Sequence, residues 1–154
     1  MTTMKTLLVA FLMIFTFISC NNTKKNTEVK AEEKLTLEGT WELTSYYNYE
    51  DNKISDSFGL SEGTRQVKMY TPTHVMWARK VPSDSTEFFG FGKYIITDTS
   101  LVETLDYGSA FMNQAIEENI EFPFELKLEK DRFIQIDLDD DGNRIFSENY
   151  VRIE

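Results

Sequence analysis

The chain has 154 residues, one cysteine, one histidine and a formal net charge of −10 from 16 basic and 26 acidic side chains. Its length favours a single domain. One cysteine excludes an internal disulfide and a cysteine-based zinc site, and the acidity argues against nucleic acid, whose phosphates would repel the protein. Because the chain is 14% aromatic with few glycines and prolines, we expect a folded, aromatic-rich domain rather than disorder.

The N-terminus has the pattern of an export signal. Lys5 precedes an apolar run at residues 7–18, whose twelve residues are too few to cross a bilayer, which takes about 20. The run ends at Ser19-Cys20, and a small residue followed by cysteine at this place resembles the lipobox of bacterial lipoproteins. The resemblance implies cleavage before Cys20, a diacylglycerol on its sulfur and an acyl chain such as palmitate on its amine. The alternative is an ordinary secretory peptide followed by a cysteine without this role.

These features divide the chain into three predicted parts. Residues 1–19 are a signal peptide, residues 20–35 a polar tether that holds the protein on the membrane, and residues 36–154 the folded domain. In lipoproteins of this type, an aspartate after the cysteine often marks retention at the inner membrane. The chain has Asn21 there, and no acidic run follows directly, so we expect the outer membrane and its periplasmic face.

Alternation of apolar and polar residues predicts eight β-strands. It is clearest at residues 120–128, where Pro123 indicates an edge position or a bulge. Residues 110–118 are the one predicted helix, with Ser109 as its N-cap, and residues 51–63 are a longer loop and a candidate lid. The predicted strands are residues 40–49, 65–70, 74–80, 88–97, 101–107, 120–128, 132–138 and 145–153.

Eight antiparallel strands with short connections predict an all-β fold, an up-and-down β-barrel with one short helix. A two-sheet sandwich is the alternative, although its crossovers need longer connections. Barrels of this size enclose a small ligand or fill their interior with side chains.

Both ends of the predicted barrel resemble the lipocalin-like (calycin-type) domains. Gly39-Thr40-Trp41 resembles their Gly-x-Trp opening, and residues 148–153 resemble their closing strand. Residues 68–78 and 90–107 are similar to segments of small lipocalin-like lipoproteins of Gram-negative bacteria. The resemblance implies a barrel floor of Gly39, Trp41 and Arg152, with a cation–π contact between the arginine and the indole ring.

Five residues are candidates for lining a ligand cavity. The lipocalin-like arrangement turns inward the face of residues 74–80 that carries Trp77 and Arg79. Glu103, Leu105 and Tyr107 are predicted to share one face of residues 101–107. The Glu103 carboxylate needs a partner among these apolar neighbours. Arg65, Arg79 and Arg152 are the candidates. Such a pair serves either ligand recognition or structure. The candidate lining residues are Trp77, Arg79, Tyr94, Glu103 and Tyr107.

Two glycines lie on the same strand face as Tyr94. Gly90 and Gly92 alternate with bulky residues at 88–97. They either leave space for a neighbour or ligand, or let the strand bend at a barrel corner.

One motif matches a calcium-binding loop. Its Asp-x-Asp-x-Asp-Gly-x5-Glu spacing is that of an EF-hand, but an EF-hand needs flanking helices, whereas residues 132–138 alternate like a strand. Asp-Gly-Asn between two alternating runs favours a hairpin turn instead. We therefore predict no metal, and the alternative calcium ligands are Asp137, Asp139, Asp141 and Glu148.

The predicted function is non-catalytic binding of a small, largely apolar molecule by a membrane-anchored protein, without a cofactor. The chain has no hydrolase motif and no glycine-rich phosphate loop. His74 is predicted to make a structural hydrogen bond at a strand end, with a general base or haem ligand as the alternative. The alternative functions are a filled-barrel interaction module in envelope assembly and an enzyme that uses His74 or Glu103.

Overall fold

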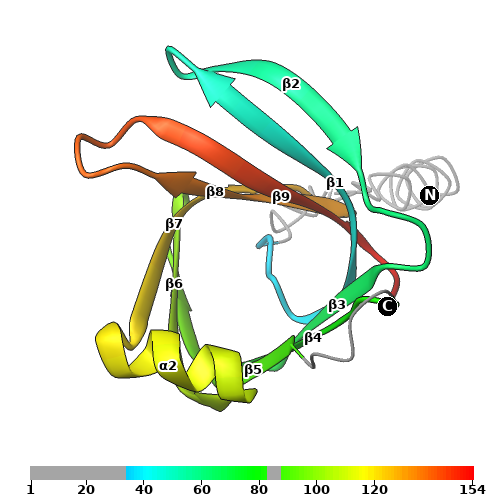
Figure 1. Ribbon diagram of the computed structural model, residues 1–154, viewed down its shortest axis with the longest axis vertical. Helices are drawn as coiled ribbons and strands as arrows, with labels where there is room; N and C mark the ends of the chain where they lie inside the picture. The colour runs from blue at the N-terminus through cyan, green and yellow to red at the C-terminus, as the bar shows by residue number, and fades with distance from the viewer. Residues whose placement is uncertain (1–33, 83–87) are drawn as a thin grey trace, which may run out of the picture. The chain divides into compact units, whose positions relative to one another are not determined.

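The computed structural model describes residues 34–82 and 88–154, which belong to one compact unit, Lys34–Glu154. Within this part of the chain, no helix is long and apolar enough to cross a membrane. The predicted signal peptide, Cys20 and most of the predicted tether lie outside the described residues. The elements are β1 (Gly39–Glu50), β2 (Lys53–Gly59), β3 (Arg65–Tyr70), β4 (His74–Lys80), β5 (Phe88–Ile96), β6 (Ser100–Gly108), α2 (Ala110–Glu118), β7 (Glu121–Leu128), β8 (Arg132–Leu138) and β9 (Arg144–Arg152) (Figure 1).

The strands form one antiparallel sheet that closes into a ring. Consecutive strands pair from β3 to β9, and β1 pairs with both β3 and β9. These pairings join eight strands, β1 and β3 to β9, into the ring visible in Figure 1. The predicted all-β, up-and-down architecture with one short helix is confirmed, and the two-sheet sandwich is wrong. Each predicted strand begins and ends within one residue of the observed one.

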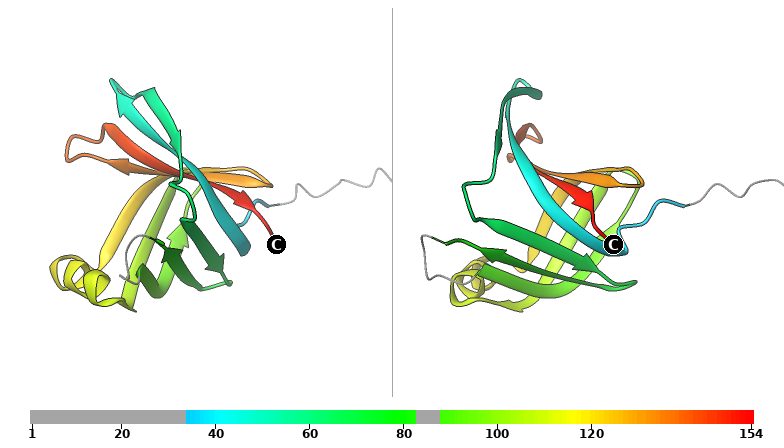
Figure 2. Two further views of the ribbon diagram at one scale, coloured as in Figure 1. Left: turned by 45° about the vertical axis from the view of Figure 1, so that its right-hand side comes forward. Right: turned by 90° about the vertical axis from the view of Figure 1, so that its right-hand side faces the viewer.

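The prediction of a lid loop at residues 51–63 is wrong, because the segment contains an additional strand, β2, outside the eight strands of the ring. Asp51 and Asn52 have φ values of 50° and 61°, as a two-residue hairpin turn requires. β2 then pairs back onto the second half of β1, and Figure 2 shows this hairpin extending beyond the ring. All residues of β2 are exposed, so it carries no alternation of buried and exposed side chains that could predict a strand.

Strands β7 and β8 pair along only part of their length. Glu125–Ile136 is the last of their pairs, so the first half of β7 has β6 as its sole neighbour. Pro123 lies in this half, where its missing N–H costs no ladder hydrogen bond. This confirms the edge position that the proline indicated, and it leaves the ring open beside β7.

Helix α2 has the predicted bounds and follows β6 at the open end of the ring. The Ser109 side chain accepts a hydrogen bond from the Met112 amide at 3.5 Å, which confirms the predicted N-cap. The helix packs against β5 and β6. Its Met112 and Ile116 side chains contact the hydrophobic core from this end.

The other end of the ring is closed by an apolar floor. Leu37, just before β1, and Trp41 are fully buried, and the indole N–H of Trp41 donates to the Leu37 carbonyl at 2.7 Å. Phe133 packs edge-on against Trp41 with ring centroids 4.9 Å apart, and it stacks on Tyr150 at 4.5 Å. These contacts account for the aromatic residues at both ends of the domain sequence.

Arg152 covers the outside of this floor, as the resemblance implied. Its guanidinium lies 4.0 Å from the centre of the Trp41 ring and donates to the carbonyl oxygens of Thr36 and Glu38. Gly39 has a φ of 126°, and a side chain there would overlap Arg152. Glycine is therefore required at the point where the chain enters the ring.

Candidate functional site

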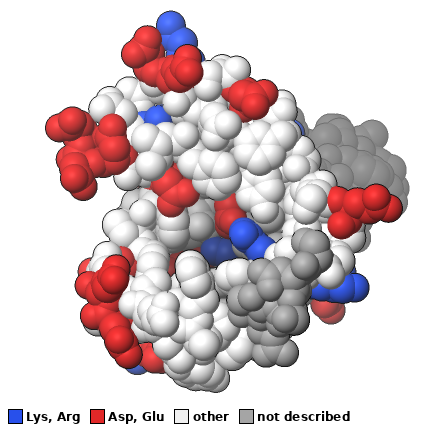
Figure 3. Space-filling model, viewed as in Figure 1, with Lys and Arg blue, Asp and Glu red and all other residues white. Residues whose placement is uncertain are grey.

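A cavity of about 320 Å³ lies inside the ring, between the floor and α2. Figure 3 shows it as a hollow in the open face, with charged side chains at its base. Its volume is at the lower end of the roughly 300–1,000 Å³ that small-molecule pockets occupy. The ring therefore has an apolar, packed end and a hollow end.

One wall of the cavity is apolar and largely aromatic. It comes from β4 to β7 and from α2, which adds Phe111 and Met112 across the open end. The ring of Trp77 lies against Gly90, where a Cβ atom would be 2.8 Å from the indole nitrogen. Gly90 thus leaves space for a neighbour, which is one of the two predicted roles. The apolar lining residues are Trp77, Phe88, Leu105, Phe111, Met112, Phe122 and Phe124.

The polar wall of the cavity comes from β3, β8 and β9 together with Arg79 on β4 and Glu103 on β6, and its first charge cluster is buried. Lys68 and Glu103 are each about 2% exposed and form an ion pair at 2.9 Å. The Lys68 ammonium also donates to the Gln135 side-chain oxygen at 2.7 Å, and the Tyr70 hydroxyl donates to Glu103 at 2.6 Å. Burial, and then the Glu103 charge, raise the pKa of the Tyr70 hydroxyl well above its usual value.

The prediction that Arg65, Arg79 or Arg152 neutralises Glu103 is wrong, because Lys68 does so. Lys68 lies on β3 between Gln66 and Tyr70 at alternate positions, and all three side chains point inward. In the sequence this pattern resembles a solvated face, so the residue types alone gave no reason to place a lysine inside. Removing one partner of such a buried pair typically costs about 3–5 kcal/mol, because the other charge is left unpaired.

A second charge cluster lies closer to the mouth of the cavity. Arg79 donates to one Glu148 oxygen at 2.7 Å, while the other oxygen accepts from Gln66 at 3.2 Å and from the Tyr150 hydroxyl. Arg79 also donates to the Gln66 side-chain oxygen. Burial, and then Glu148, raise the pKa of the Tyr150 hydroxyl well above its usual value. Every charge in the two clusters therefore has its own counter-charge.

Asp137 is the charged lining residue without a partner. Its carboxylate makes no hydrogen bond or ion pair with any described residue, although it lines the cavity. Burial, followed by repulsion from Glu148, raises its pKa from 3.8 to about 6, and Lys68 offsets part of this rise. At neutral pH the cavity thus holds one carboxylate that the protein itself does not neutralise.

The five predicted lining residues divide between three places. Trp77, Arg79 and Glu103 line the cavity. Tyr94 lies deeper, toward the floor, where its ring packs edge-on against that of Tyr70 at 4.9 Å and its hydroxyl donates to the Thr71 carbonyl at 2.8 Å. It therefore contributes to the closed end rather than to the cavity.

The expected inward position of Tyr107 is wrong. Phe91 on β5 faces Tyr107, but the next residue, Gly92, faces Leu105, so β6 holds one extra residue. Such a bulge reverses the faces of the residues on either side of it. Tyr107 is consequently 54% exposed and packs against Phe91 on the outside of the ring.

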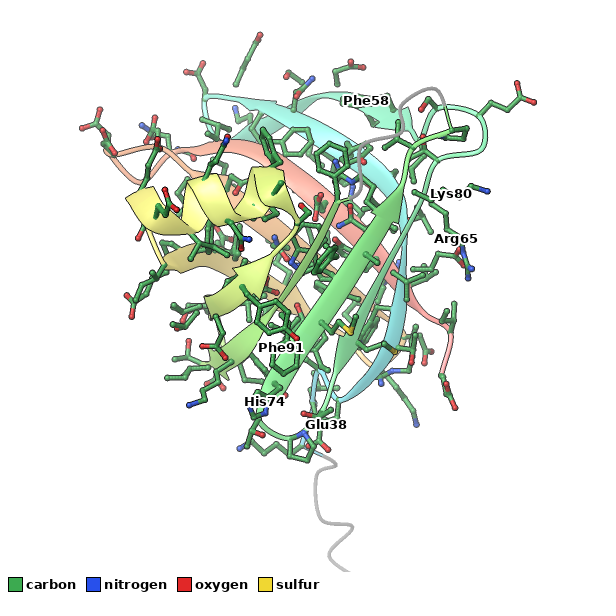
Figure 4. All side chains as sticks on the ribbon, turned by 60° about the horizontal axis from the view of Figure 1, so that its bottom comes forward. Glu38, Phe58, Arg65, His74, Lys80 and Phe91 are labelled. Carbon is green, nitrogen blue, oxygen red and sulfur yellow. The ribbon has the colours of Figure 1, made fainter. Side chains whose placement is uncertain are left out.

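His74 lies on the outside of the ring near the closed end. Its Nδ1 atom is 2.7 Å from the Thr73 hydroxyl, and its ring stacks on Phe91. Figure 4 shows His74 and Phe91 at the same end as Glu38, with Phe58 at the opposite end. This confirms the structural hydrogen bond and separates the histidine from the cavity.

The calcium motif lies in a hairpin, as predicted. Asp137 is in β8 and Glu148 in β9, strands that pair with each other, and Asp139 caps the turn between them by accepting from the Asn143 amide at 2.7 Å. Backbone hydrogen bonds to this carboxylate, the first from Asn143, lower its pKa. Among the described residues, no group of three or more His, Cys, Asp or Glu side chains is placed to hold a metal ion.

The sequence could not predict five further polar residues of the cavity. Gln66, Lys68 and Gln135 alternate with apolar residues in the wrong sense for a buried strand face, and Asp137 and Glu148 fit only the alternative calcium motif. The one available indication was the need of Glu103 for a counter-charge.

Comparison of the chain with protein-family models, with curated proteins and with solved structures finds no match.

Proposed function

We propose that this chain is a lipid-anchored, lipocalin-like protein of the cell envelope that binds a small molecule in its ring without transforming it. The ligand is largely apolar, with a polar group at one end. The observation that carries the proposal is the cavity of about 320 Å³ whose lining contains both aromatic and charged side chains. A small amphipathic molecule satisfies both walls, because its apolar body is removed from water while its polar end meets fixed charges.

The family assignment is part of this proposal. It is supported by the Gly39-x-Trp41 opening, by Arg152 over the indole ring and by an eight-strand ring that is closed at this end. The anchor rests on the apolar run that ends at Cys20. Attachment at Cys20 to the outer membrane, on its periplasmic face, would place the cavity within reach of molecules in the envelope.

The alternative function, an interaction module, expects a filled interior and an exposed apolar patch. The outer face does carry an apolar row of four residues on adjacent strands. Met69 pairs with Met76, Met76 with Phe91 and Phe91 with Tyr107, and Met69, Met76 and Tyr107 are exposed. The interior, however, is hollow, which favours ligand binding. Met76→Lys separates the two functions, because it disrupts the row and leaves the cavity unchanged. Ligand binding should persist in this variant, whereas binding of a protein partner through the row should be lost.

The proposal is tested with a neutral fluorescent probe, N-phenyl-1-naphthylamine, titrated into the full chain in phosphatidylcholine nanodiscs. We expect saturable binding above the background of empty nanodiscs. Met112→Trp should weaken binding at least tenfold, because the larger side chain fills the cavity from α2. Gln114→Trp places the same ring on an exposed position of that helix and should bind as the original chain does. Absence of saturable binding to the original chain would overturn the proposal.

A further inference from the structure

The charges that line the cavity do not balance. Lys68 and Arg79 are its two cations, and each is held by its own carboxylate, Glu103 or Glu148. Asp137 adds a third carboxylate for which no described residue supplies a cation. The polar wall therefore carries one excess negative charge when all three carboxylates are ionised.

Asp137 also lies where the ring is open. The last pair between β7 and β8 joins Glu125 to Ile136, so Phe124 and Asp137 are the first residues beyond it on the two separating strands. Both line the cavity. A ligand that enters beside β7 would thus meet a carboxylate on one side and an aromatic ring on the other.

The aromatic wall suits a cation as well as an apolar body. The faces of aromatic rings attract positive charge, and the Lys68 ammonium already lies 5.9 Å from the centre of the Phe124 ring. Phe122 and Trp77 extend the same wall. An anionic group would find no free cation on the polar wall, because both cations that line it are already paired.

We propose that the ligand carries a cationic nitrogen, a protonated amine or a related group, and that Asp137 is its counter-ion. The inference rests on the proposed function and specifies its ligand class. The ammonium group takes the place beside Asp137, and the apolar body lies along Trp77 and the phenylalanines. The charged groups that face Asp137 are Lys68 on β3, Arg79 on β4, Glu103 on β6 and Glu148 on β9.

Three probes of the same shape test the charge preference. They are 4-phenylbutylammonium, 4-phenylbutanol and 4-phenylbutanoate, each titrated by calorimetry at pH 7.5 into the full chain in phosphatidylcholine nanodiscs. We expect the ammonium to bind at least tenfold more tightly than the alcohol and the carboxylate to bind most weakly. Asp137→Asn should abolish the preference for the ammonium over the alcohol and leave the affinity for the alcohol within about twofold.

Asp141→Asn is the matched control, because it makes the same change in the exposed turn of the same hairpin, and it should retain the preference. Equal affinities for the ammonium and the alcohol, or an unchanged preference in Asp137→Asn, would overturn the inference while the proposed function stands. If none of the three probes binds and the neutral fluorescent probe also fails, the proposed function falls with it. Calcium that displaces the ammonium and is itself lost in Asp137→Asn would indicate a metal site instead.

Discussion

At the scale of single residues, the interior of this protein contains a buried ion pair whose cation is a lysine. Lys68 and Glu103 lie deep in the ring, and no fully buried side-chain nitrogen or oxygen among the described residues lacks a hydrogen-bond partner. A buried hydrogen-bonded network of this kind fixes the strands that carry it. Asp137 differs, because its carboxylate is partly exposed and unpaired.

Asp137 should make the stability of the protein depend on pH. Its pKa is about 6 in the folded chain and about 3.8 when unfolded, so the folded state holds this proton more tightly. The contribution of Asp137 to stability is then greatest below pH 4 and is lost as the pH rises through 6. We expect Asp137→Asn to raise the free energy of unfolding by about 1 kcal/mol at pH 7.5, a value reduced for screening by water, and to change it little at pH 4.

Thermal unfolding followed by circular dichroism at both pH values measures this difference. Asp141→Asn is again the control, because that side chain lies in the exposed turn. A midpoint that is equal in Asp137→Asn and the original chain at pH 7.5 would contradict the expected cost of the buried charge.

At the scale of elements, irregular positions in the strands determine what faces the cavity. The bulge at Asp106 moves Tyr107 outside and keeps Leu105 inside. The incomplete pairing of β7 with β8 opens the ring beside Asp137. The β1–β2 turn is tied to the β8–β9 turn, where Asn52 accepts from the Arg144 amide at 2.7 Å. The bulge and the incomplete pairing therefore determine which side chains line the cavity and where the ring is open.

Gly92 lies opposite the β6 bulge and should not tolerate a side chain. A Cβ atom there would overlap the carbonyl oxygen of Thr104, which belongs to the backbone of the next strand. We expect Gly92→Ala to lower the free energy of unfolding by about 1–3 kcal/mol, because the strands must separate to accept the methyl group. Urea denaturation followed by circular dichroism measures the change.

Gly59→Ala is the matched control for this substitution. No atom lies within 4 Å of a Cβ at position 59, so its effect should stay within about 0.5 kcal/mol. Equal losses in the two variants would show that the close approach at Gly92 is not what requires glycine.

At the scale of the whole molecule, ring closure leaves β2 with an unpaired outer edge. The pairing of β1 with β9 removes the two edges that an open eight-strand sheet would have. β2 is short and exposed, and it carries Lys53 and Asp56, which are residue types that discourage pairing between molecules. The one exposed edge among the described strands is therefore protected against pairing between molecules.

The proposed anchor gives an expectation for the complete protein. In a Gram-negative host fed an alkyne analogue of palmitate, we expect the chain to incorporate the label and to fractionate with the outer membrane. Cys20→Ser should lose the label, because the acylated thiol is absent, whereas Ser19→Ala keeps a small residue before the cysteine and should be labelled. In-gel detection of the alkyne measures this, and an unlabelled original chain would contradict the anchor.

Strand positions were predictable because a half-buried strand must alternate. Nearly every ring strand has one apolar face, and the turns between them contain Asp, Gly, Asn and Pro at the expected places. β2 escaped prediction because neither of its faces is buried. Tyr107 was misplaced because a bulge changes the faces of a strand without leaving a clear mark on the pattern.

The sequence by itself therefore determined the eight ring strands and the helix after Ser109, since local periodicity and short motifs specify these, and the resemblance of its ends identified Trp41 and Arg152 at the floor. The sequence placed Trp77, Arg79 and Glu103 in the cavity, but only the tertiary structure decided which charges there meet. Lys68 on β3 and Glu103 on β6 are neighbours because β4 and β5 curve the sheet until distant parts of its inner face come together. The pairing of charges across a closed ring depends on that curvature, and no local pattern along the chain encodes which inward polar residue meets which.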